Sequence, residues 1–174
     1  MQVTFTKSGH RRYLVTIDRE QGPPLVPRGG PGYDDHLPHD IAHFAVEEQL
    51  GLALGVFGQL AAGGAGIFAP APVDRTTGER RRAQCIAAAG RPDMARSEAV
   101  VRICTARWQA SSGRAAGPVA DHGNVATVAE TERVLARFDE LSARWRALPD
   151  GGSLVLDWPV SGSGSAPTRR RAPR

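Results

Sequence analysis

The residues best suited to chemistry lie close together, between positions 34 and 48. Three of the five histidines, His36, His39 and His43, fall there within eight residues. The same stretch holds five acidic residues: Asp34, Asp35, Asp40, Glu47 and Glu48. Imidazole and carboxylate groups transfer protons and bind divalent metal ions. This histidine- and acid-rich stretch is therefore the candidate functional site of the chain.

Two of these histidines are separated by one helical turn, in the segment His39-Asp40-Ile41-Ala42-His43. The segment resembles the H-E-x-x-H motif of the zincin metalloproteases, with aspartate in place of glutamate. The resemblance covers five residues. It implies that His39 and His43 bind a divalent metal such as zinc, and that Asp40 is the catalytic general base of a hydrolytic reaction.

A metal site of this kind needs a third ligand, and the sequence leaves its identity open. Glu47 lies about 12 Å along the helix axis from His39, at 1.5 Å per residue, so one ion is not expected to bind both. Better-placed candidates lie outside this helix: His36, Asp34, Asp35 and an acid on another helix such as Glu98.

A purely structural interpretation of the same residues is the alternative. Asp34, Asp35 and Asp40 would cap and charge the helix N-terminus. His39 and His43 would be partly buried polar residues bonded to their neighbours. The two interpretations differ in geometry, because histidines aimed at one point in a cleft favour a metal, whereas separately bonded histidines favour a structural role.

A longer phrase resembles one carried by uncharacterised bacterial proteins. It reads YDDHLPHDIAHFAVEEQLGL from Tyr33 to Leu52 and continues through residues 55–64. The likeness extends over most of the chain before the tail. It implies a bacterial origin and no defined activity.

The hydrophobic pattern predicts an α+β fold. Alternation of apolar and polar residues predicts an N-terminal hairpin and a final strand: residues 2–6, 12–18 and 153–158. Helical periodicity predicts five helices: residues 37–50, 53–62, 80–89, 93–110 and 127–148. The prolines and glycines of residues 20–36 predict a loop. We expect a small antiparallel sheet packed on four or five helices in one domain, residues 1–160, followed by a disordered basic tail, residues 161–174.

Composition limits the classes of partner. The net charge of +4 equals the charge of four tail arginines, so nucleic-acid binding is not expected outside the tail: Arg169, Arg170, Arg171 and Arg174. Cys85 and Cys104 form no CxxC pair, which favours reduced thiols in a cytoplasmic protein. Residues 49–73 are uncharged, but their glycines lower the hydrophobicity, so a membrane span is not expected.

A second class of function also fits the sequence, namely a non-enzymatic binding or protein-interaction module. Gly55, Gly58 and Ala62 are small residues that permit close approach between backbones. Together with the histidine-rich helix they would form a recognition surface or a homo-oligomer contact. A monomer that stays folded after Gly55→Leu would contradict the helix-contact version.

The mixture of histidines and acids also predicts a pH dependence. Carboxylates favour the charged imidazolium, and we expect their effect to outweigh burial and to raise the histidine pKa values. Metal-free protein is then expected to melt at a higher temperature at pH 6 than at pH 8. Metal-loaded protein is expected to do the opposite, because ligand histidines must be neutral.

Overall fold

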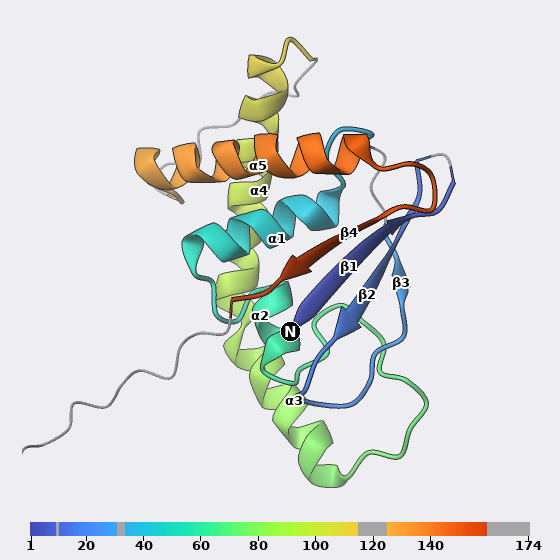
Figure 1. Cartoon of the computed structure of the whole chain (residues 1–174). Coiled ribbons are helices and arrows are strands. Elements are labelled where there is room, and N and C mark those ends of the chain that lie inside the picture. Colours follow the sequence, from blue (N-terminus) through green and yellow to red (C-terminus); the bar gives the residue numbers. More distant parts are fainter. Residues whose placement is uncertain (10, 31–33, 115–124, 160–174) are drawn as a thin grey trace, which may run out of the picture.

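The computed structural model describes residues 1–9, 11–30, 34–114 and 125–159. In this part of the chain, one antiparallel sheet has the strand order β3-β2-β1-β4 (Figure 1). Its strands are β1 (Gln2–Lys7), β2 (Tyr13–Asp18), β3 (Arg28–Gly29) and β4 (Ser153–Asp157). The helices are α1 (His39–Leu50), α2 (Val56–Ala61), α3 (Thr77–Ala89), α4 (Arg91–Ser111) and α5 (Val128–Ala147). The expected α+β fold is thus confirmed, while the predicted tail lies outside the described residues.

The sheet joins the two ends of the described chain. β1 pairs with β2 on one side and with β4 on the other, so that Phe5 lies opposite both Val15 and Leu154. These three side chains are buried. The alternation of apolar and polar residues seen in the sequence therefore gives the sheet one face that packs against the helices.

One strand was not predicted. β3 has only two residues and lies within the proline- and glycine-rich segment that the sequence predicts as a loop. It pairs with β2, where Arg28 lies opposite Val15. This pairing holds Arg28 at the edge of the sheet, beside the start of α1.

Helix α1 is the centre of the fold (Figure 1). All of its residues from Asp40 to Glu47 are buried. Phe44 makes edge-on ring contacts with Phe5 of the sheet, at 6.4 Å between centroids, and with Phe57 of α2, at 5.2 Å. Because α1 also contacts α4 and α5, it packs against the sheet and three helices.

The start of α1 differs from the prediction that Asp34 or Asp35 caps it. The N-cap residue is Pro38, which makes no side-chain cap. The Asp34 carboxylate instead accepts hydrogen bonds from the backbone N–H groups of His36 and Leu37, at 2.8 and 3.4 Å. Asp34 therefore orders the turn before the helix, too early in the chain to reach the first helical N–H groups.

A buried carboxylate connects the end of α1 to the start of α2. Glu47 is 0% exposed, and its two oxygens accept hydrogen bonds from the backbone N–H groups of Val56 and Phe57, both at 2.8 Å. A Cβ atom on Gly55 would lie 2.3 Å from the Glu47 carboxyl carbon. Glycine is therefore required at position 55 for this close approach.

The longer helices follow the predicted apolar patterns. α4 buries Ser97, Val101, Cys104 and Trp108 on one face, and α5 begins with a capping box between Thr127 and Glu130. α3 begins earlier than predicted because Thr76 and Glu79 form a second capping box. No helix in the described part of the chain is both long and apolar enough to cross a bilayer.

Candidate metal site

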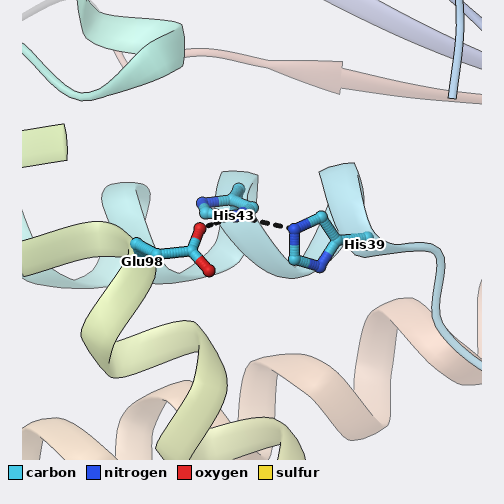
Figure 2. A group of neighbouring side chains, drawn as sticks. All are labelled: His39, His43 and Glu98. Atoms are coloured by element: carbon cyan, nitrogen blue, oxygen red, sulfur yellow. Dashed lines mark hydrogen bonds and ion pairs between the residues drawn. The ribbon is translucent and has the colours of Figure 1, made fainter. Parts of the chain in front are cut away.

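His39, His43 and Glu98 bring three potential metal-ligand atoms together (Figure 2). His43 Nε2 lies 3.1 Å from His39 Nε2 and 3.3 Å from a carboxylate oxygen of Glu98. All three ligand atoms lie within 4.8 Å of one another. The histidines come from successive turns of α1 and the glutamate from α4, so this triad requires the packing of two helices.

Ser97 sets the orientation of His43 by contacting Nδ1, the ring nitrogen that does not face the other two members of the triad. Ser97 Oγ donates a hydrogen bond to Glu47 at 3.0 Å and lies 2.9 Å from His43 Nδ1. A serine hydroxyl has one hydrogen, so with Glu47 ionised Ser97 must accept its second hydrogen bond from His43 Nδ1–H. Above pH 7, where Glu47 is ionised, this network assigns the hydrogen of neutral His43 to Nδ1 and leaves the Nε2 lone pair facing His39 and Glu98.

That tautomer leaves more hydrogen-bond acceptors than hydrogens in the triad. His39 can donate its Nε2 hydrogen to the His43 lone pair. The Glu98 carboxylate, 3.3 Å from the same His43 nitrogen, then faces a second acceptor. Two acceptors at this distance repel each other, although water screens the 67%-exposed side chain of Glu98, and a proton or a metal cation between them removes the repulsion. The arrangement is therefore suited to binding a cation.

Burial disfavours protonation of His43, so a proton does not readily serve as that cation. Desolvation of the 9%-exposed His43, reinforced by neighbouring His39, lowers the pKa of His43 to about 4. The sequence-based prediction of raised histidine pKa values is therefore wrong for this residue. Glu98 and Asp40 do favour the charged form, but more weakly than burial opposes it.

The structure also explains why the other acids of the stretch have little influence on His43. Asp34 binds Arg114, Asp35 pairs with Arg11, and Glu48 binds Arg137: these three ion pairs have N–O distances of 3.3, 3.7 and 2.8 Å. Each of these carboxylates thus has its own arginine partner. Proximity in sequence therefore overstates the negative charge around His43.

Asp40, the predicted catalytic base, lies beside the triad but is held by other partners. One of its oxygens accepts hydrogen bonds from Arg28 at 3.0 Å and from the Tyr13 hydroxyl at 3.1 Å. Burial, with the adjacent Asp40 charge, raises the pKa of Tyr13. Tyr13 is thus a permanent hydrogen-bond donor at neutral pH, and the catalytic role of Asp40 stays a prediction.

The triad opens into a cavity of about 440 Å³. Its polar lining comes from the triad with Arg28, Asp40 and Ser97. Its apolar lining consists of Val56, Phe57, Ile67, Met94 and Ala95. A volume in this range, with an apolar wall and convergent polar groups, is typical of small-molecule sites.

The remaining predicted site residues lie apart from the triad. His36, Asp34 and Asp35 belong to the turn before α1, and Glu47 faces the start of α2, so the structure does not bring them into the cluster of ligand atoms. Glu98 was one of several third-ligand candidates. Ser97 and Arg28 were missed as site residues. The only signal for Ser97 was a serine within the apolar stripe of its helix.

The helices proposed as an interaction surface face the interior. α1 is buried from Asp40 to Glu47, and α2 is buried from Val56 to Leu60. The small residue Gly58 allows close contact with the backbone of Ala53 in the same chain. Internal packing therefore explains the glycines, and they no longer support an interaction surface. The interaction module stays a prediction.

The lowered pKa of His43 predicts how acid affects the metal-free protein. A histidine with a folded pKa of about 4 and an unfolded pKa of about 6.5 favours folding above pH 6.5, and this contribution is lost as the pH falls toward 4. Between pH 7.5 and pH 5 the free energy of unfolding of the wild type should therefore fall by about 2 kcal/mol relative to His43→Gln.

Urea denaturation of both proteins at the two pH values measures this difference. Burial raises the pKa of Glu47 to about 7, which has the opposite sign: that contribution is lost as the pH rises from about 4.5 to 7. Because Glu47 is present in both proteins, its effect cancels in the comparison. If the free energy of unfolding of the wild type, relative to that of His43→Gln, stays constant or rises between pH 7.5 and pH 5, the assignment of a neutral, desolvated His43 is contradicted.

Comparison of the chain with protein-family models, curated proteins and solved structures finds no match. The resemblances to zincins and to bacterial proteins therefore stay predictions.

Proposed function

We propose that this chain is a divalent-metal-binding protein in which His39, His43 and Glu98 hold one ion. Two imidazoles and one carboxylate are the ligands of several catalytic zinc sites. The separations of His43 Nε2 from His39 and from Glu98, 3.1 and 3.3 Å, suit a tetrahedral ion with bonds of about 2.0–2.2 Å, and all three ligand atoms lie within 4.8 Å of one another. By the chemistry of these donors the favoured ion is zinc.

The observation that carries the proposal is the buried network behind His43. Ser97 Oγ lies 2.9 Å from His43 Nδ1 and donates to Glu47, while His43 Nε2 faces His39 and Glu98. Metal-binding histidines commonly donate their other ring N–H to a carboxylate or an equivalent acceptor, which fixes the tautomer. A histidine with a purely structural role has no need of a lone pair directed at a carboxylate.

Metal analysis of protein purified without an affinity tag tests the proposal. About one equivalent of zinc, retained through gel filtration and removed by a chelator, is the expected result. Chelator-treated protein should regain one equivalent when zinc is added. Protein that neither contains nor regains a divalent metal would overturn the proposal and favour the structural interpretation of the histidines.

Ser97→Ala should weaken zinc binding without removing a ligand. His43 Nδ1–H then lacks its acceptor, so the imidazole is free to change tautomer and rotate. We expect a 10–100-fold lower zinc affinity, as is common when a group supporting a ligand is lost. Isothermal titration measures the affinity, and ¹⁵N shifts of the His43 ring in metal-free protein should change from one tautomer to a mixture.

Ser142→Ala is the matched control, since Ser142 is also a buried helical serine but lies on α5. Its zinc affinity should equal that of the wild type. Equal affinities for the two variants, or an unchanged His43 tautomer in Ser97→Ala, would show that Ser97 does not position His43.

A hydrolytic role is the finer form of this proposal. Three protein ligands leave a fourth position for water, and a bound metal lowers the pKa of that water. Asp40 lines the same cavity and has one oxygen that is not bonded to Arg28 or Tyr13 in the described structure. That oxygen is the candidate acceptor for the proton of the water.

Asp40→Asn is expected to keep zinc while losing zinc-dependent hydrolysis. Hydrolysis of p-nitrophenyl acetate, butyrate and hexanoate by the zinc-loaded protein provides the assay. General-base catalysis typically contributes 10²–10⁴-fold, so the rate should fall by about that factor. A rate that is unchanged in Asp40→Asn would exclude Asp40 as the base, and equal rates with and without zinc would exclude metal-dependent hydrolysis of these esters.

A further inference from the structure

The cavity beside the triad has two chemically different parts. Its apolar part is formed by Val56, Phe57, Ile67 and Met94, contributed by α2, the segment after it and α4. Ile67 lines the cavity and is 44% exposed, so it places apolar surface where the cavity meets solvent. The apolar part therefore suits a hydrocarbon group that enters from outside.

The charges of the polar part depend on the metal. Apart from the histidines, Arg28 supplies one positive charge, and Asp40 and Glu98 supply two negative charges. Arg28 and Asp40 form an ion pair at 3.0 Å, so Glu98 dominates the field of the empty cavity. A divalent ion on the triad reverses the sign and leaves one net positive charge. The metal-free cavity thus repels anions, whereas the metal-loaded cavity attracts a monoanion.

We propose that the metal-loaded cavity binds a small monocarboxylate with an apolar body. Its carboxylate approaches the open position of the metal beside Arg28, and its hydrocarbon part contacts Val56, Phe57, Ile67 and Met94. This inference rests on the proposed metal site. It adds the chemical class of the ligand, because charge selects the anionic end and the apolar lining selects the chain attached to it.

Titration of hexanoate into the full-length protein tests the inference, with acetate and hexylammonium as comparison ligands. Isothermal calorimetry on zinc-loaded protein should show hexanoate binding more tightly than acetate by a factor of tens to hundreds, at roughly fourfold per buried methylene. Hexylammonium has the same chain and the opposite charge, so it should not bind. Removal of zinc should abolish hexanoate binding.

A pair of exposed-residue variants tests the role of the apolar lining. Ile67→Asn should weaken hexanoate binding severalfold and leave zinc affinity unchanged. Val73→Asn is the control, because Val73 is similarly exposed, at 47%, but does not line this cavity. Both positions are at the surface, so neither variant is expected to disturb folding.

The outcomes separate this inference from the proposed function. If zinc binds but hexanoate binds no more tightly than acetate, or if Ile67→Asn and Val73→Asn behave alike, the ligand class is wrong and the metal site stands. If hexanoate binds equally with and without zinc, the charge argument is wrong. If zinc itself does not bind, the proposed function fails and this inference fails with it.

Discussion

Replacing His43 by alanine should lower the zinc affinity of the protein by more than about 100-fold. That is the upper end of the loss seen when a group supporting a ligand is removed, and His43 is the ligand itself. His43 also lies between the other two members of the triad, 3.1 Å from His39 and 3.3 Å from Glu98. Without His43, only two of the three ligands, His39 and Glu98, remain. Competition with a fluorescent zinc chelator measures the change.

His36→Ala is the control for the loss of an imidazole from the same stretch. His36 lies in the turn before α1 and outside the triad, so this variant should retain wild-type affinity. His39→Ala and Glu98→Gln should resemble His43→Ala, whereas Glu132→Gln, on the exposed face of α5, should resemble the wild type. Loss of affinity in His36→Ala with retention in Glu98→Gln would mean that the metal is held by a different set of residues.

Glu47→Gln should destabilise the fold by about 2–4 kcal/mol, the largest effect on stability that we expect from a single isosteric change. Above pH 7, where Glu47 is ionised, its carboxylate accepts from two backbone N–H groups and from Ser97. A glutamine amide presents an NH₂ group to one of those donors and leaves it buried without an acceptor, which costs about 1–3 kcal/mol. The remaining bonds lose the strength that comes from a charged acceptor.

Thermal or urea denaturation of the metal-free protein measures this effect. A melting temperature lower by roughly 5–15 °C is expected for a chain of this length. Glu132→Gln should change the free energy of unfolding by less than about 0.5 kcal/mol, because its side chain is exposed. If the two variants are equally stable, the buried carboxylate does not hold α1 against α2.

The sequence was sufficient to predict the elements that have a clear period. The alternation of Val3 and Phe5, and of Tyr13 and Val15, predicted two paired strands whose core-facing residues are buried in the structure. β3 was missed because two residues have no period, and its pairing depends on β2 rather than on its own side chains. The same limitation concealed Arg28, which has no local signal within a proline- and glycine-rich segment.

The candidate site was predictable only in part. The spacing of His39 and His43 places both imidazoles on one face of a helix, as the structure shows. Glu98 is 55 positions from His43 and reaches it only because α4 packs on α1. The burial of His43, which decides its pKa, also depends on tertiary packing. Counting the acids near His43 in the sequence therefore predicted a raised pKa, whereas the pKa of His43 is lowered.

The position of a bound metal tests the central claim most directly. Crystals of the protein grown with zinc, measured above and below the zinc absorption edge, locate the ion without any assumption about its ligands. We predict one anomalous peak about 2.0–2.2 Å from His39 Nε2, His43 Nε2 and a Glu98 oxygen. His43 Nδ1 should remain hydrogen-bonded to Ser97. A peak at other residues, or no peak while His39 and His43 stay bonded to each other, would contradict the metal site.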